Sequence, residues 1–236
     1  MGKTGKMKAC GERKPYTIPL PAKLIKFIQG KPTKTVLEIG CGYGRACFFL
    51  HKHGFEIVGV DLDRVQVRLA SEDAKKRKIR QGIRFVVNDA RDLCFPDCSF
   101  DAVTMLGVLT LVSRSGRPRI MNEVDRVLRP SGYVFVEEFG RTWKNPVYRK
   151  RYRDDTKVTG EMGTVTVKDE SGKILHFGHH FTRQEIRSLL KGFSIISFEE
   201  DVFTSYYHKN WVKGYTMLAQ KQAARGTPLC GTVQQV

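Results

Sequence analysis

The sequence predicts an α/β fold: a doubly wound, mostly parallel sheet of seven strands, with helices on both faces and a β-hairpin insertion. Short apolar or β-branched runs alternate with amphipathic helical segments between residues 35 and 137, joined by short links. This alternation is typical of repeated βα units. Two later strand-like segments, 194–200 and 211–220, complete the seven strands.

The most informative stretch is 36–45, in which a buried-strand pattern leads into glycines at alternate positions. Val36 to Ile39 has the character of a strand covered on both faces. Gly40, Gly42 and Gly44 allow the backbone to turn sharply and a ligand to come close, where a Cβ would block it. The stretch therefore predicts a strand that ends in a ligand-binding turn.

The segments that follow agree with such a site. A short helix is expected at 46–53 and a second strand at 56–60, which ends at Asp61. This is the position of the ribose-binding carboxylate in nucleoside sites of doubly wound folds. A dinucleotide site would have its third glycine where Arg45 stands, and the Gly-Lys-Ser/Thr ending of a phosphate loop is absent.

The pattern Glu-x-Gly-x-Gly-x-Gly from Glu38 to Gly44 resembles the first motif of the class I S-adenosylmethionine-dependent methyltransferases. Their cofactor has no phosphate, so no phosphate cradle is needed. The resemblance implies a Rossmann-like fold over about residues 36–220, with the last two strands as an antiparallel pair that closes the sheet.

Looser motifs extend the resemblance. In the family, an acid followed by a small residue after the third strand (83–87) hydrogen-bonds the adenine amino group, and Asp89-Ala90 matches this; a turn-capping Asp is the alternative. The fourth strand, 99–105, begins with the family-like Phe-Asp pair, in which Asp101 is expected to be structural. The strand ends at Met105, so residues 105–107 should face the reactive end of the cofactor. The implied cofactor-binding residues are Glu38, Gly40, Cys41, Gly42, Gly44, Asp61, Leu62, Asp89, Ala90 and Met105.

Composition limits the class of protein. With 236 residues, 41% hydrophobic and 28% charged, the chain suits one globular domain. No apolar run reaches the ~18 residues that a membrane-spanning helix needs. Six scattered cysteines imply no disulfide framework, so we expect a cytoplasmic protein. Cys94 and Cys98 have no second pair at ligand spacing, so no metal site is predicted.

Charge predicts the kind of partner. The formal net charge is +17, from 41 Lys and Arg against 24 Asp and Glu. Such an imbalance favours encounters with polyanions. General solubility is the alternative explanation, but we expect a polyanionic partner, RNA and in particular tRNA.

Segment 141–153 supports this expectation, because cations alternate there with aromatic residues and no acid occurs before Asp154. Such a mixture suits phosphates and stacked bases. The alternative is a surface helix whose aromatic side chains reach back to the core. The proposed substrate residues are Arg141, Tyr148, Lys150, Tyr152, Arg153 and His180.

A hairpin is predicted from strands at 163–168 and 174–177, as an insertion over the ligand edge of the sheet. Thr182 and Glu185 form the pattern of a capping box for a helix at 183–190. His179 and His180 precede this box. Either is a candidate proton acceptor or substrate contact, and the alternative is a purely structural role.

The expected organisation has three parts. Residues 1–34 form a basic N-terminal arm and a helix (22–29) of the kind that often covers the cofactor in the resembled family. Residues 35–221 form the methyltransferase domain, with its insertion at about 141–181. Residues 222–236 form a mobile tail.

Within the class, the chain looks most like the methyltransferase type 11 group. Segment 180–186 and the pair Asn210-Trp211 also resemble the wobble-uridine tRNA methyltransferases that esterify a carboxymethyl group. The resemblance implies methyl transfer to RNA, and an activating subunit would be invisible in this sequence. The alternatives are a small-molecule methyltransferase acting on a quinone or lipid precursor, a protein methyltransferase, and a non-catalytic binding module. No side chain stands out as a general base.

Overall fold

The computed structural model describes residues 18–205 and 210–222, and its main sheet has the strand order β3-β2-β1-β4-β5-β9-β8. The basic arm before Ile18 and the tail beyond Gln222 lie outside the described residues. The strands of this sheet are β1 (Thr35–Ile39), β2 (Glu56–Asp61), β3 (Ile83–Val87), β4 (Phe100–Leu106), β5 (Leu128–Gly140), β8 (Phe193–Ser205) and β9 (Asn210–Lys221).

Strands β1 to β5 are parallel, whereas β9 runs antiparallel to both β5 and β8. The predicted seven-stranded, mostly parallel fold is therefore confirmed. The chain order reverses at β1, since β2 lies on one side of it and β4 on the other. Ligands of open α/β sheets bind at such a switch point, beyond the carboxyl ends of the strands.

Helices cover both faces of the sheet. The helices are α1 (Ala22–Ile28), α2 (Arg45–Lys52), α3 (Arg64–Lys76), α4 (Gly116–Val127), α5 (Pro146–Thr159) and α6 (Arg183–Leu189), with a 3₁₀ turn, η1 (Leu109–Leu111). Residues of α1 and α2 share one apolar cluster with the sheet, and residues of α4 and α6 share a second. Burial of apolar side chains in these two layers stabilises the domain.

Helix α1 forms as predicted but lies on the sheet and not over the strand tips. Leu24 and Ile28 are buried against the sheet, and the ring of Phe27 meets Tyr133 edge to face at 5.2 Å. The residues just before α1 lie at the glycine turn, because the Arg45 guanidinium donates to the carbonyl of Ile18 at 2.5 Å. The segment that precedes the helix, and not the helix itself, therefore lies beside the glycine turn.

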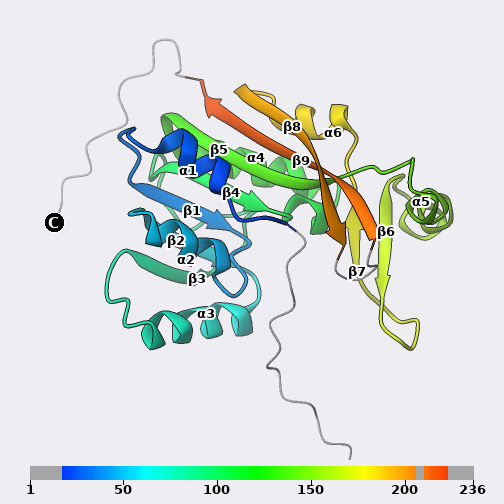
Figure 1. Cartoon of the computed structure of the whole chain (residues 1–236), viewed down its shortest axis with the longest axis horizontal. Helices are drawn as coiled ribbons and strands as arrows, with labels where there is room; N and C mark the ends of the chain where they lie inside the picture. The colour runs from blue at the N-terminus through cyan, green and yellow to red at the C-terminus, as the bar shows by residue number, and fades with distance from the viewer. Residues whose placement is uncertain (1–17, 206–209, 223–236) are drawn as a thin grey trace, which may run out of the picture.

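The insertion consists of α5 and a separate two-stranded sheet, β6 (Thr164–Lys168) and β7 (Ile174–His179), at the end of the main sheet where the parallel strands terminate (Figure 1). The predicted hairpin is confirmed. The capping box of α6 is also confirmed, since Thr182 and Glu185 each accept the other's backbone N–H.

The sequence pattern predicts a helix at 64–80 and, after a turn at 128–132, a strand at 133–137, and the structure differs at one boundary of each. Helix α3 ends at Lys76, short of Arg80, because Lys78 takes a left-handed conformation with φ 58°. Strand β5 begins at Leu128, earlier than predicted, because Leu128 pairs with Phe100 of β4. The predicted turn is present as an irregular stretch of β5 between two pairs, Leu128 with Phe100 and Tyr133 with Ala102. Ser131 has φ 62° within this stretch.

Candidate functional site

The tips of β1, β2 and β3 are held together by hydrogen bonds. The backbone N–H of Cys41 donates to the carbonyl of Val60 at 2.9 Å, and that of Asn88 donates to the carbonyl of Asp61 at 3.1 Å. The N–H of Gly42 donates to Oδ2 of Asp61 at 2.9 Å. The three strand ends therefore form one continuous edge, as a nucleoside site at the switch point requires.

The backbone conformation of the glycine turn requires glycine at three positions. Gly40, Gly42 and Gly44 have φ values of 70°, 52° and 81°, a region that side chains rarely occupy. A Cβ on Gly40 would lie 2.5 Å from Cγ2 of Val108. A Cβ on Gly42 would meet only Oε1 of Gln66, at 3.0 Å. The turn is thus packed against the β4 loop at its first glycine and more open at its second.

Asp61 is oriented for a ligand by two backbone groups. In addition to the bond from Gly42, its Oδ1 accepts the N–H of Asp63 at 3.0 Å. Each carboxylate oxygen therefore has one backbone donor and keeps room for a ribose hydroxyl. Beside it, Leu62 is 62% exposed, and Val65 and Val87 are also exposed. Val65 and Val87 were not predicted from sequence; together with Leu62 they offer an apolar surface for a flat ring.

Asp89 has the predicted place after β3, but its carboxylate is engaged. The guanidinium of Arg91 donates to both oxygens of Asp89, at 2.7 to 3.1 Å, and the backbone N–H of Arg91 donates to Oδ1. These hydrogen bonds lower the pKa of Asp89. An adenine amino group would have to compete with Arg91 for this carboxylate. Ala90, the small residue that follows Asp89, is half-buried.

Three buried oxygen atoms on the α1 side of the sheet have no hydrogen-bond partner in the structure: Oε2 of Glu38, Oγ1 of Thr104 and Oε2 of Glu137. They come from the adjacent strands β1, β4 and β5. Burial raises the pKa of Glu38 to about 8, against the opposing charge of Arg45. Buried polar atoms without partners are rare in proteins, so these three mark a place where a polar ligand group or water can bind. Glu38 was predicted from the glycine motif, whereas Glu137 and Thr104 were not predicted.

The position of Met105 at the end of β4 differs from the prediction that this residue faces the cofactor. Met105 is fully buried in the core cluster that faces α4, so its side chain does not line the ligand edge. Alternation along the strand turns Leu106 to the other face, where it packs beside Ile18. Gly107 follows with φ 73°, and a Cβ there would lie 2.5 Å from Cδ1 of Ile18.

A buried carboxylate fixes the loop after β4. Oε1 of Glu138 accepts the N–H of Leu109 at 2.6 Å, and Oε2 accepts that of Thr110 at 3.1 Å. Burial raises the pKa of Glu138 to about 8 in spite of these bonds. The sequence offered no signal for this role, because Glu138 stands in an ordinary strand pattern.

Some of the residues predicted to bind an RNA substrate are buried in the structure and others are exposed. Tyr148 and Tyr152 are buried in the insertion, so they do not offer free ring faces to bases at the surface. This matches the alternative of a helix whose aromatics reach the core. Arg141 points inward to Glu185 at 3.1 Å. Only Lys150 and Arg153 are exposed, and Lys150 is paired with Asp154.

His180 is buried among aromatic rings. Its Nδ1 lies 2.7 Å from the Tyr152 hydroxyl, which also accepts the N–H of Thr142 at 3.0 Å. The imidazole stacks on Phe139, with ring centres 5.5 Å apart. Burial raises the pKa of Tyr152 to about 12, so the tyrosine stays protonated. The Tyr152 hydroxyl and Nδ1 of His180 therefore share one hydrogen bond, whose direction depends on the tautomer of the imidazole.

His179 belongs to a structural network. Its Nδ1 lies 2.9 Å from Oγ1 of Thr164 and 3.5 Å from Oε2 of Glu161. Burial lowers the pKa of His179 to about 4, and the charge of Arg117 acts in the same direction. The imidazole is therefore neutral at physiological pH and helps to attach the hairpin to the domain.

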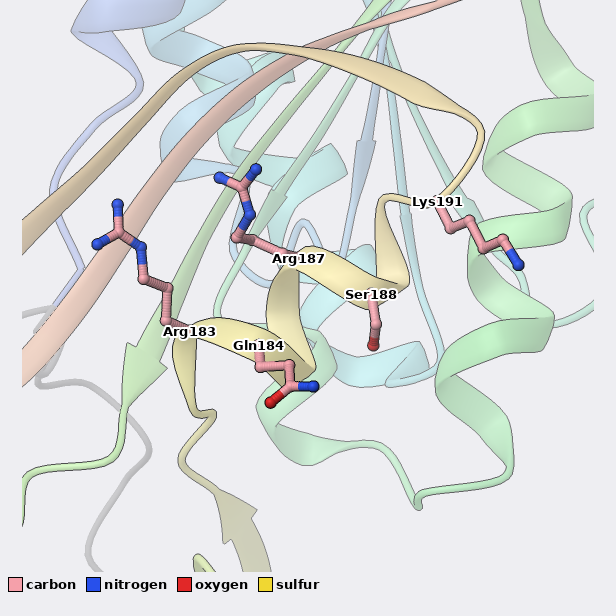
Figure 2. A pocket seen from close by; sticks show the side chains of 5 residues that line it. All are labelled: Arg183, Gln184, Arg187, Ser188 and Lys191. Atoms are coloured by element: carbon pink, nitrogen blue, oxygen red, sulfur yellow. The ribbon is translucent and has the colours of Figure 1, made fainter.

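A hollow of about 690 Å³ lies elsewhere, on the outer side of α6, and is lined by Arg183, Gln184, Arg187, Ser188 and Lys191 (Figure 2). The guanidinium groups of Arg183 and Arg187 lie 5.0 and 5.4 Å from the ring centre of Phe198. None of these residues belongs to the strand tips, so the hollow is separate from the site at the glycine turn.

Among the residues that the structure describes, no group of three or more His, Cys, Asp or Glu side chains is arranged to hold a metal ion. Within the same residues, no helix is long and apolar enough to cross a membrane.

Residues 36–132 match the family model described as a methyltransferase domain. The 2-phytyl-1,4-beta-naphthoquinone methyltransferase of Arabidopsis thaliana chloroplasts is 36% identical over 113 residues, 45% of this chain and 42% of the relative. The fatty-acid O-methyltransferase of Mycolicibacterium smegmatis is 33% identical over 126 residues, 51% of this chain and 43% of the relative. The matches thus span less than half the length of these curated relatives.

A solved structure matches over a much larger share. The crystal structure of an S-adenosylmethionine-dependent methyltransferase from Methanosarcina mazei is 33% identical, with a TM-score of 0.79. The match covers 85% of this chain and 98% of that one. The glycine turn and the oriented Asp61 agree with this match. The chain therefore belongs to the class I S-adenosylmethionine-dependent methyltransferases.

Proposed function

We propose that this methyltransferase acts on a small acceptor molecule with an apolar body, bound beyond the end of β4. The observation that carries the proposal is the apolar character of that end of the sheet. Leu106 and Phe139 are half-buried and pack against an apolar and aromatic cluster from the segment before α1, the insertion and the strands β8 and β9. The residues of this cluster are Ile18, Tyr148, Tyr152, Val165, Phe203 and Val212. These six residues are buried, so the half-buried Leu106 and Phe139 form the apolar wall that an acceptor would meet. An apolar wall favours an apolar acceptor.

The residues at the strand tips fit the cofactor of the family. Asp61 is oriented toward a ribose, and Leu62, Val65 and Val87 can cover an adenine ring. The partnerless oxygens of Glu38, Thr104 and Glu137 can accept from the ammonium of an amino-acid end. Bound S-adenosylmethionine supplies an electrophilic methyl group on its sulfonium. The chain's contribution is to bind, exclude water and align the acceptor for in-line displacement.

His180 lies within the aromatic cluster beyond β4, where its ring stacks on Phe139 and is hydrogen-bonded to Tyr152. A carboxylate is anionic at neutral pH and needs no general base for methyl transfer, so we propose a carboxylate as the acceptor group. The name of the fatty-acid O-methyltransferase among the relatives agrees with such an acceptor.

RNA is a second candidate acceptor, favoured by one specific observation. Arg149, Arg153 and Lys157 are exposed at successive turns of α5. Like charges at this spacing repel one another, which a bound polyanion would relieve. Helix α5 belongs to the insertion, at the end of the main sheet where the parallel strands terminate (Figure 1).

The test is incubation of the protein with methyl-labelled S-adenosylmethionine and fractionated cell extract. We expect the label in organic-soluble small molecules, and none after Asp61→Ala substitution. The double variant Arg149→Glu, Arg153→Glu should label small molecules as well as wild type does. Label in nuclease-sensitive RNA, lost in the double variant, would establish the second candidate; label in protein would overturn both.

A further inference from the structure

Both tryptophans of the chain lie at one end of the main sheet. Trp143 precedes α5 and Trp211 is near the start of β9. The side-chain amide of Asn145 donates to the carbonyl of Trp211 at 3.0 Å. The N–H of Lys213 donates to Oγ1 of Thr142 at 2.8 Å. These two bonds join the segment before α5 to the start of β9, so the fold brings the two tryptophans together.

Large apolar side chains are exposed around this junction. Trp143 and Trp211 are each 42% exposed, Val147 in the first turn of α5 is 45% exposed, and Val202 of β8 is 70% exposed. Val202 is paired with Lys213, two residues beyond Trp211. We call these four residues the tryptophan patch. Single exposed apolar residues are ordinary, but such a group at one end of a protein indicates a surface that is covered by a partner.

Two exposed cations lie next to residues of the tryptophan patch in the sequence: Lys144 follows Trp143, and Arg149 is two residues beyond Val147. The acids close to the patch are already paired: Glu200 binds Lys213 at 2.6 Å and Asp154 binds Lys150. Asp201, next to Val202, binds Lys23 of α1 at 3.0 Å. With a net charge of +17 on the chain, the complementary partner is anionic.

Two anionic partners differ in what they require from the apolar residues. Single-stranded nucleic acid stacks its bases on aromatic faces, and a valine has no such face. A membrane surface accepts tryptophan at the headgroup level and aliphatic side chains just below it. Two of the four residues, Val147 and Val202, are aliphatic, and Val202 is the most exposed of the set.

We propose that the tryptophan patch docks this protein reversibly on anionic membrane surfaces. The two tryptophans and two valines enter the headgroup region, while Lys144 and Arg149 contact lipid phosphates. Each basic residue near an anionic surface favours binding, and this contribution weakens with salt. This inference stands whichever acceptor is methylated.

Docking there would also orient the acceptor side of the domain. The ring of Trp143 meets that of Tyr152 edge to face at 5.3 Å, and Tyr152 hydrogen-bonds His180. The patch is therefore one side chain away from the aromatic cluster beyond β4. A docked protein would hold its acceptor wall close to the lipid surface.

Intrinsic fluorescence provides a direct test, because the chain has only the two tryptophans of the patch. The full-length protein is titrated with phosphatidylcholine vesicles that contain or lack phosphatidylglycerol. We expect a blue shift of the emission and quenching by brominated lipid with the anionic vesicles, both reversed by high salt. Absence of the shift and of quenching with anionic vesicles would overturn the proposal.

Matched variants on β8 locate the contact. Val202→Glu keeps both tryptophans and should lower partition onto anionic vesicles at least about tenfold, because burial of one such side chain contributes roughly 1.5 kcal/mol. Ile196→Glu, an exposed position further along the same strand, should partition as wild type does. Unchanged thermal unfolding of both variants excludes misfolding. Equal partition of Val202→Glu and wild type would contradict the proposal, and salt-sensitive quenching by tRNA without any vesicle effect would assign the surface to nucleic acid instead.

Discussion

The N–H of Gly42 donates to the carboxylate of Asp61 across the tips of β1 and β2, at 2.9 Å. This bond links the glycine turn to the predicted ribose-binding acid. The same carboxylate accepts the N–H of Asp63, so it is oriented by the backbone before any ligand binds. Preorganisation of this kind lowers the entropic cost of binding.

Asp61→Asn should weaken binding of S-adenosylmethionine at least about tenfold, since a hydrogen bond to a charged group contributes about 1.5–3 kcal/mol. Calorimetric titration measures the change. Asp63→Asn is the matched control, because Asp63 caps α3 through the N–H groups of Val65 and Gln66, and asparagine caps as well as aspartate does. Equal affinities of Asp61→Asn and wild type would refute the assignment.

Gly44→Ala should destabilise the glycine turn more than its backbone conformation alone requires. Its Cβ would lie 2.7 Å from the ring of Phe85 and 2.9 Å from that of Phe48. Gly54 is the control, with φ 90° and no atom within 4 Å of a built Cβ. In urea unfolding, Gly54→Ala should lower the free energy of unfolding only by the cost of a left-handed non-glycine residue, about 1–2 kcal/mol. Gly44→Ala should lower it by more. Losses of the same size would mean that the two rings move aside without cost.

Arg117→Met should be strongly destabilising. The guanidinium of Arg117 is 6% exposed and makes two bonds to Glu161, at 2.6 and 3.1 Å. Removal of one partner leaves an uncompensated buried charge and costs about 3–5 kcal/mol. The exposed pair Arg68 and Glu72 is the control, and Arg68→Ala should cost at most about 0.5 kcal/mol. Denaturant unfolding measures both; a small loss for Arg117→Met would show that water already reaches Glu161.

Glu38 should make the stability of the free protein depend on pH. Burial raises its pKa from 4.5 to about 8, against Arg45 and with the help of Glu137. Between these values the folded state keeps the proton and the unfolded state has lost it, so this contribution to stability falls as the pH rises from 4.5 to about 8.

Glu38→Gln removes this titration. The difference in unfolding free energy between Glu38→Gln and wild type should therefore shift in favour of the variant as the pH rises over this window. Glu72→Gln, at the surface, provides the comparison and should show a difference that does not change with pH. A pH-independent difference for Glu38→Gln would mean that the carboxyl group is ionised throughout.

Much of the cofactor edge could be predicted because its signals are local. The order of strand, alternate glycines, helix, strand and Asp61 is written in consecutive residues, and so is the capping box of Thr182 and Glu185. The structure places these elements as expected. Asp101 is also structural as predicted, since it accepts the N–H groups of Lys34 and Thr35.

Other features depend on which neighbours the sheet supplies. Met105 seemed to be at the ligand edge because it ends a strand, but the pleat turns it into the core. Tyr148 and Tyr152 share a basic segment with Lys150 and Arg153, and their burial follows from packing with Phe203 and Val212 of the distant strands β8 and β9. No local pattern announces such contacts.

The sequence by itself determined the fold class, the order of the strands along the chain and the glycine turn with its acid, because backbone preference and hydrophobic periodicity act over a few residues. Only the tertiary structure decided which side chains face the cofactor edge, which oxygen atoms of Glu38 and Glu137 are left without partners, and that Trp143 and Trp211 lie at one end. The physical reason is that burial and hydrogen-bond satisfaction depend on strands that are adjacent in the sheet but distant in the chain.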